Sequence, residues 1–296
     1  MGQLSRPPAT SGRRVIDRAA VTLASFGADR DWLLCFCPPE TRSALTALFE
    51  IEHEVMDSLR PGLEHSVAHA RLEWWSDELT RLAQGTPRHP ATEILAASAL
   101  DRGTSPPDLH PLVEHVRVDL ACVAFIARAE LDEHLDAWGQ SLFRTAARLS
   151  IDADSDPERQ AHARLAAERL SAHAGRLVRE SELLRRFAFH ALSGRIYVPL
   201  GDPPATPSRW TTRPLGPIES EALAARRREI GQALKQLASE TSLAERPALR
   251  VPMLWMAFAV TPSGRDSDLL SPLRRTIATW RSAVALSRGR VPYELH

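Results

Sequence analysis

Cysteine is scarce in this chain, which has three, Cys35, Cys37 and Cys122, among its 296 residues. They are too few and too unevenly spaced for a disulfide framework. Cys35-x-Cys37 also has no second pair that could complete a zinc site. We therefore expect buried free thiols and a protein of a reducing compartment such as the cytoplasm.

The chain also lacks a net charge, since Lys+Arg and Asp+Glu both number 37. Only one of the cations is a lysine, Lys235. A chain with formal net charge +0 has no overall field to attract nucleic acid or an anionic membrane. Nucleic acid is thus not an expected partner, and any electrostatic recognition is local.

Long apolar runs are missing as well. The longest, VPMLWMAFAV at 251–260, is about half the length of a membrane-spanning helix. We expect no transmembrane segment, which leaves peripheral membrane contact open. Residues 1–14 contain arginines but no apolar core for a signal peptide, and they are expected to be a disordered lead to a helical domain at 15–296.

The remaining composition favours helices. Glycines number 14, alternating Val/Ile/Thr runs are few, and Ala, Leu, Arg and Glu recur every three or four residues. Proline clusters divide this pattern, and the stretch 199–217 is expected to be an ordered loop or linker. The predicted fold class is all-α, a single bundle with helices near 13–27, 40–60, 64–84, 90–102, 108–127, 130–149, 158–192, 218–242, 248–260 and 266–288.

The helix predicted at 40–60 has an apolar stripe that must face the core, formed by Leu45, Leu48, Phe49 and Leu59. Projection at about 100° per residue points its acids Glu50, Glu54 and Asp57 away from this stripe. It places Glu52, Met56 and Arg60 in line on the stripe, with His53 at its margin.

Charges on an inward face need partners. In one account Arg60 ends the helix and reaches water, and Glu52 pairs locally. In the other account the stripe lines a polar cavity. Glu50-x-x-His53 is half of a di-iron carboxylate motif, but the sequence has no second half, so a solvated acidic face is the better interpretation.

The helix predicted at 158–192 carries Arg179, Glu182, Arg186 and His190 on one long face, which is typical of a solvent face. The string GRIYVP follows at 194–199 and includes Arg195 and Tyr197.

This string resembles the GRIYLP-type end of the second conserved helix in squalene and phytoene synthases. Other pieces occur in the order of that family over about residues 20–200: Ser25-Phe26, PPETR at 38–42, RLEWW at 71–75, HPAT at 89–92 and Asp119-Leu120. The resemblance implies a single all-α bundle of the isoprenoid synthase type. It also implies head-to-head joining of two prenyl diphosphates, with Mg²⁺ held by two aspartate-rich motifs on facing helices.

The chain departs from the family at these motifs. Met56, Asp57 and Arg60 stand at the first motif, where only the middle acid is retained, and Arg186 and His190 stand at the second. The residues matching three further site positions of the family are His53, Arg179 and Glu182. The resemblance therefore implies a Mg²⁺ site whose ligands are missing here, and we expect no cofactor.

Two hypotheses explain why other residues replace the aspartates of the family at these motifs. Arg60, Arg179 and Arg186 bind a phosphate directly, or Arg186 pairs with Glu52 and closes the old cavity. We favour a pseudoenzyme that binds an isoprenoid or other lipid, or that acts on a protein partner as an assembly factor. The alternatives are an active prenyl transferase with an arginine-based diphosphate site and a plain helical scaffold.

Overall fold

The computed structural model describes residues 30–37, 39–122, 125, 127–151, 156–193, 195, 197, 216–242, 245, 246, 248–261, 271–288 and 290–292. In these ranges every regular element is a helix, so the all-α prediction is confirmed. The expected disordered lead 1–14, the helix predicted at 13–27 and the proline-rich stretch 199–215 lie outside the described residues.

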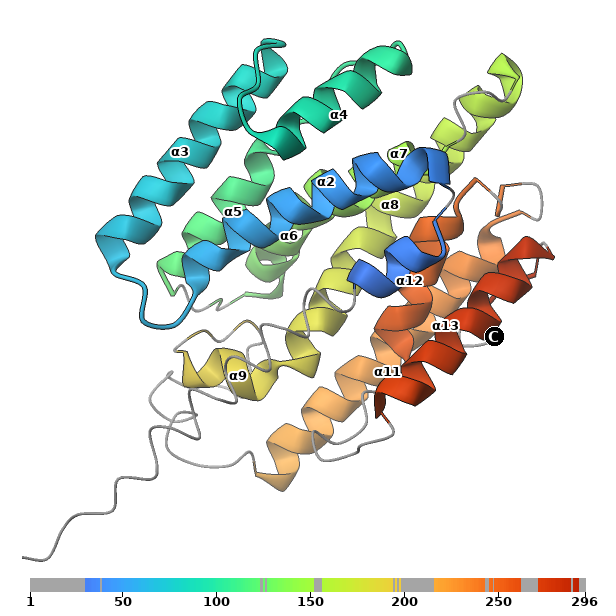
Figure 1. The fold of residues 1–296 in the computed structure, drawn as a ribbon. Coiled ribbons are helices and arrows are strands. Elements are labelled where there is room, and N and C mark those ends of the chain that lie inside the picture. Colours follow the sequence, from blue (N-terminus) through green and yellow to red (C-terminus); the bar gives the residue numbers. More distant parts are fainter. Residues whose placement is uncertain are drawn as a thin grey trace, which may run out of the picture.

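A helical segment at 30–35 precedes the named elements of Figure 1. These are α2 (Pro39–Met56), the 3₁₀ turn η1 (Asp57–Leu59), α3 (His65–Ala83), α4 (Pro90–Asp101), α5 (His110–Leu120), α6 (Arg128–Trp138), the π-helical η2 (Gly139–Phe143), α7 (Arg144–Leu149), α8 (Pro157–Arg185), α9 (Phe187–Leu192), α11 (Pro217–Glu240), α12 (Arg250–Val260) and α13 (Ser271–Ser287).

Proline sets where several helices begin. Pro90, Pro111, Pro157 and Pro217 occupy the first turn of α4, α5, α8 and α11. A proline fits there because its missing N–H would have no partner within the helix and its fixed φ suits a helical start. Most helix boundaries predicted from the proline clusters are thus within two or three residues of those observed.

Three predicted helices differ from the structure. The helix predicted at 108–127 ends at Leu120, because Cys122 takes a left-handed φ of 53° that cannot continue it. The helix predicted at 158–192 is interrupted at Arg186, where φ is −109° and ψ is 18°. The helix predicted at 40–60 tightens into η1 before Arg60 and Pro61.

The helix α8 forms the centre of the bundle. It contacts α6, η2 and α7, and also α11 and α12. Figure 1 shows α11, α12 and α13 grouped opposite α3, α4 and α5. Because α8 is enclosed by these neighbours, it buries polar residues that would face solvent on a peripheral helix.

Two glycines allow the closest approach to α8. A Cβ added at Gly175 would lie 2.8 Å from the Cα of Gly139, and one added at Gly139 would lie 3.0 Å from the backbone N of Arg176. Gly139 begins the π-helical segment that joins α6 to α7 in one continuous helix from Arg128 to Leu149. The two backbones therefore touch where this helix crosses α8.

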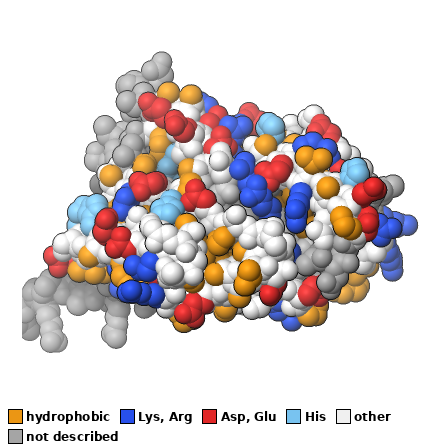
Figure 2. All heavy atoms as spheres, turned by 90° about the horizontal axis from the view of Figure 1, so that it is seen from above, with side chains coloured by type: hydrophobic (Ala, Val, Ile, Leu, Met, Phe, Trp, Pro, Cys, Tyr) orange, Lys and Arg blue, Asp and Glu red, His pale blue; other side chains and the backbone are white. Residues whose placement is uncertain are grey.

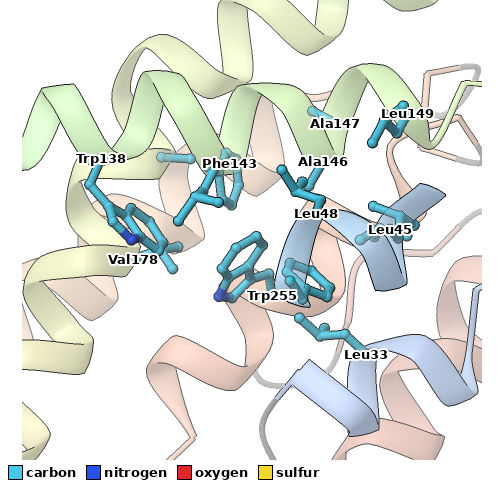
Figure 3. Packing of buried hydrophobic residues seen from close by; sticks show 14 of the residues in the cluster. Leu33, Leu45, Leu48, Trp138, Phe143, Ala146, Ala147, Leu149, Val178 and Trp255 are labelled. Carbon is cyan, nitrogen blue, oxygen red and sulfur yellow. The ribbon is translucent and has the colours of Figure 1, made fainter. Parts of the chain in front are cut away.

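The core beside this crossing is aromatic (Figure 3). The Trp255 ring packs at centroid distances of 5.4 Å from Phe49, 5.5 Å from Trp138 and 5.4 Å from Phe143. These residues come from α2, α6, η2 and α12 and hold the halves of the bundle together.

The cysteines are free, as predicted, but only Cys37 is buried, and Cys35 and Cys122 are exposed. The expectation of buried thiols is wrong for these two: Cys35 ends the helical segment 30–35, and Cys122 lies in the turn after α5. No helix within the described ranges has the length and hydropathy needed to cross a bilayer. On the face drawn in Figure 2, acidic, basic and apolar side chains are interspersed.

Candidate functional site

A buried guanidinium, that of Arg30, joins two helices at the centre of the molecule. Its Nε and Nη2 donate to the two carboxylate oxygens of Glu52 on α2, at 2.8 and 2.7 Å. Its Nη1 donates at 2.7 Å to Oε1 of Glu182 on α8. The Trp255 indole donates to the same oxygen at 3.1 Å, and its ring lies 4.3 Å from the Arg30 guanidinium carbon.

The pairing stabilises the charged forms of Arg30 and Glu182 in the interior. Burial disfavours a charged guanidinium, but the charges of Glu182 and Glu52 raise the pKa of Arg30 well above its ordinary value. Burial likewise disfavours the Glu182 carboxylate, but the charge of Arg30 lowers the pKa of Glu182 to about 2. Arg30 therefore offsets part of the negative charge that the two buried carboxylates alone would place in the interior.

A second buried cluster surrounds Arg179 on α8, whose side chain is 0% exposed. Its Nη2 donates at 3.1 Å to Nε2 of His115 on α5 and lies 3.9 Å from Oδ2 of Asp119, one turn further along the same helix. His134 on α6 approaches Oδ1 of Asp119 through Nε2 at 3.0 Å. Three helices thus supply one cluster of alternating charge.

The hydrogen bonds fix the protons on both imidazoles. A guanidinium can only donate, so Nε2 of His115 accepts from Arg179, and Nδ1 carries the proton that it donates to the His134 carbonyl at 3.0 Å. Burial, the largest effect, keeps the pKa of His115 well below its ordinary value. Because the Asp119 carboxylate accepts, Nε2 of His134 is protonated. Burial alone would raise the pKa of Asp119, but these neighbours hold it well below its usual range.

The two clusters meet on α8, because Arg179 Nη1 lies 3.7 Å from Oε2 of Glu182, one turn further along α8. Met56 Sδ lies 3.9 Å from Arg179 Nη2. We call the joined set the central ion-pair network; it comprises Arg30, Glu52, His115, Asp119, His134, Arg179 and Glu182. Every member is buried.

Two residues of the GRIYVP string, Arg195 and Tyr197, lie beside this network. Arg195 Nε donates to the Asp119 carbonyl at 3.0 Å, and its Nη2 lies 3.5 Å from the Leu59 carbonyl. Tyr197 is buried, which raises its pKa well above the ordinary value, and its ring contacts His190 edge-to-face at 5.1 Å. Burial and the charge of Arg179 lower the pKa of His190 to about 3.

The structure brings together most of the site residues predicted from the sequence. Glu52, Arg179, Glu182, His190 and Tyr197 are all buried, as an inward-facing site requires. The polar stripe on α8 is thus not the solvent face that its residue types suggest, because helices enclose α8 on several sides.

Other predicted site residues lie at or near the surface. The inward position predicted for Arg60 is wrong, because the η1 turn rotates it outward, where its side chain is 51% exposed and 3.4 Å from Asp57. This placement agrees with the account in which Arg60 ends the helix and reaches water. His53 is exposed, and Arg186 is half-buried where α8 ends.

The predicted ion pair between Glu52 and Arg186 is wrong, as is local pairing of Glu52, because its partner is Arg30, 22 residues earlier. No pattern in the sequence points to Arg30, which falls between two predicted helices. Helical projection of 108–127 would identify His115 and Asp119, since they share a face with the buried Leu112 and Val116.

Among the described residues, His115, Asp119 and His134 have ligand atoms within 4.8 Å of one another, close enough for a metal. Their geometry does not suit one, however. The imidazole rings stack at 3.9 Å with planes 12° apart, whereas a metal must lie in the plane of each ring that binds it. The Arg179 guanidinium also occupies the lone pair of His115 Nε2.

Comparison with known proteins agrees with this arrangement of helices. The sequence model of the squalene/phytoene synthase family matches residues 24–261, further than the 20–200 expected from the motifs. No curated protein and no solved structure gives a significant match. The family match covers well over half of the chain, and the chain therefore belongs to the squalene/phytoene synthase family.

Proposed function

We propose that this family member does not carry out Mg²⁺-dependent joining of prenyl diphosphates and acts instead as a non-catalytic assembly factor. The observation that carries the proposal is the central ion-pair network. In it, the buried guanidiniums of Arg30 and Arg179 are already engaged by Glu52, Glu182 and Asp119.

The charges of this network disfavour a diphosphate. Two guanidiniums face three carboxylates, and His115 is neutral. Two like charges 4 Å apart, such as a phosphate oxygen and a carboxylate, repel each other by about 4 kcal/mol at an effective dielectric constant near 20. A diphosphate would therefore meet a centre without spare positive charge, and Arg60, which the phosphate-binding hypothesis requires, is at the surface.

The residues at the metal-ligand positions of the family do not fit Mg²⁺. This ion takes hard oxygen ligands. Met56, Arg60, Arg186 and His190 offer a thioether, two guanidiniums and an imidazole in place of the four aspartates that the family pattern implies. We propose that the chain uses no Mg²⁺ at this site.

The apolar side of the network favours an assembly role over a role in holding a prenyl chain inside the bundle. Trp255, stacked against Arg30, also packs against Phe49, Trp138 and Phe143. Figure 3 shows Trp138, Phe143 and Trp255 among the buried apolar side chains of the core. Function through the molecular surface is therefore better supported than function through an internal channel.

The decisive experiment incubates the purified protein with farnesyl or geranylgeranyl diphosphate and Mg²⁺, beside a family member that has both aspartate motifs. We expect no head-to-head product. Clear turnover would overturn the proposal and favour the arginine-based transferase, as would magnesium-free binding of either diphosphate in calorimetry. Mass spectrometry of copurifying lipids should find no isoprenoid at stoichiometric level; a stoichiometric one would identify a lipid carrier instead.

A further inference from the structure

The outward face of α13 carries apolar side chains that the bundle does not cover. Ile277 is 46% exposed and Trp280 is 58% exposed. At about 100° per residue, Ile277 projects opposite Leu286, which is buried against the bundle, and Trp280 projects about 120° away from Leu286. This helix therefore has an inward apolar face used for packing and an outward apolar face that packing does not explain.

The charge along this segment has one sign. Residues 269–293 include five arginines, at 274, 275, 281, 288 and 290, and no aspartate or glutamate. The complete chain has a formal net charge of +0, so this concentration is local. Arg281, Arg288 and Arg290 are exposed in the structure.

The charge follows the apolar stripe along the helix. Helical projection places Arg281 and Arg288 on the outward face, beside Ile277 and Trp280. Long arginine stems can lie along an apolar surface while the guanidinium reaches phosphate groups. Tryptophan prefers the boundary between hydrocarbon and headgroups. A narrow apolar stripe with arginines beside it is the pattern of a helix that lies in a membrane surface.

We propose that the outward face of α13 binds the surface of an anionic lipid bilayer, with Ile277 and Trp280 inserted among the headgroups. Arg281, Arg288 and Arg290, which are exposed, supply the complementary charge. A protein interface of ordinary size needs about 800 Å² on each partner, which a stripe of this width on one helix does not readily provide. This inference is independent of whether the central ion-pair network supports catalysis.

A second exposed tryptophan provides the contrast. Trp74 on α3 is 43% exposed, but its exposed neighbours Glu73 and Asp77 are acidic. An anionic surface would repel this part of α3. Trp74 is therefore a matched control, with similar exposure and the opposite local charge.

The test uses flotation of the full chain with phosphatidylcholine vesicles that contain or lack phosphatidylglycerol. We expect binding only to the anionic vesicles, and weaker binding as salt is raised. Trp280→Ser should weaken it, and Trp74→Ser should not. The double variant Arg288→Gln with Arg290→Gln should lose about 25-fold in affinity, since each arginine near an anionic surface contributes about fivefold.

The control for charge is Arg159→Gln with Arg164→Gln, which removes two exposed arginines from α8 and should leave binding unchanged. Absence of vesicle binding, equal binding to neutral vesicles, or equal loss in the control variants would each overturn the proposal. Saturable binding to polyglutamate without vesicle binding would also overturn it and point to an acidic protein partner.

Discussion

Arg30 and Glu182 are 152 residues apart in the sequence, yet the Arg30 guanidinium donates to the Glu182 carboxylate at 2.7 Å in the interior. The same guanidinium holds Glu52. One arginine from the segment before α2 thus ties that segment and α2 to the central helix α8. Its loss would leave the buried carboxylate of Glu52 without a cation and that of Glu182 with Arg179 alone.

We expect Arg30→Met to lower the free energy of unfolding by about 3–5 kcal/mol, the cost of leaving a buried ion pair without one partner. Urea unfolding followed by circular dichroism measures this change. Arg60→Met is the matched control, because Arg60 is half-exposed and its ion pair with Asp57 should contribute less than about 1 kcal/mol. Equal losses in the two variants would contradict the central role of Arg30.

The assignment of partners can be checked by double-mutant cycles. The pair Arg30 and Glu52 should give a coupling energy of about 1–3 kcal/mol, because their side chains share two hydrogen bonds. The pair Arg186 and Glu52 should give a value near zero. A large coupling in the second cycle would restore the ion pair first predicted from the sequence.

The stability of the protein should fall in acid in two steps. His190 has an ordinary pKa of 6.5 and a pKa of about 3 in the fold, so below pH 6.5 the unfolded chain takes up a proton that the folded one does not. Stability therefore decreases as the pH falls from 6.5 towards 3, by at most about 1.4 kcal/mol per pH unit. Glu182, lowered from 4.5 to about 2, adds a second loss below pH 4.5, because its stabilising ionised form is lost.

Chemical denaturation at a series of pH values separates the two steps. In His190→Gln the loss between pH 6.5 and 4.5 should become smaller, while the loss below pH 4.5 remains. His53→Gln serves as the control because its side chain is exposed, and it should keep the original profile. An unchanged profile in His190→Gln would rule out His190 as the source of the first step.

The crossing of α8 and η2 should not tolerate a side chain. Gly175→Ala places a methyl 2.8 Å from the Gly139 Cα. Because this Cα is a backbone atom that cannot move aside, we expect the free energy of unfolding to fall by about 1–3 kcal/mol or more. Gly231→Ala on α11 is the matched control. Its added methyl would meet only Val260 Cγ1 at 3.9 Å, so it should stabilise the helix by up to about 1 kcal/mol. Thermal unfolding of both variants makes the comparison.

The proton position on His115 is open to nuclear magnetic resonance. Long-range ¹H–¹⁵N spectra should show a neutral ring with the proton on Nδ1 throughout the pH range in which the protein stays folded. This is expected because Nε2 of His115 accepts a hydrogen bond from Arg179 and because burial lowers the pKa of His115. In Arg179→Met the ¹⁵N resonance of Nε2 should shift, because Nε2 loses the hydrogen bond from Arg179, while the proton stays on Nδ1 beside the His134 carbonyl. A protonated imidazolium at neutral pH would contradict the described hydrogen bonds.

Local features of the sequence predicted the helices well, because prolines and 3.6-residue periodicity act over short ranges. Periodicity also placed Glu52 correctly on the inner face of α2. It failed at Arg60, since the regular projection continued through a segment that tightens to a 3₁₀ turn before Pro61. It also failed to predict the burial of Arg179 and Glu182, because residue type alone does not show that neighbours enclose a helix.

The partners within the site depended on contacts that no local pattern encodes. Arg30 meets Glu52 and Glu182 only after the chain has folded, and the partner predicted for Glu52, Arg186, came from the family motifs instead. The stacked pair His115 and His134 likewise joins two helices. Such pairings need a three-dimensional arrangement, whereas the departures from the aspartate motifs could be recognised from the sequence.

The π-helical segment Gly139–Phe143 determines the rotational register of everything after it. A π turn accommodates one residue more than an α turn, and each residue in a helix turns the chain by about 100°. If the same residues wound as a regular α-helix, every later residue would be rotated by about 100°. Ala147 would then turn out of the core, and Arg144 and Arg148 would take the buried places of Thr145 and Leu149. The π turn thus absorbs one residue and keeps the apolar face of α7 directed at the core.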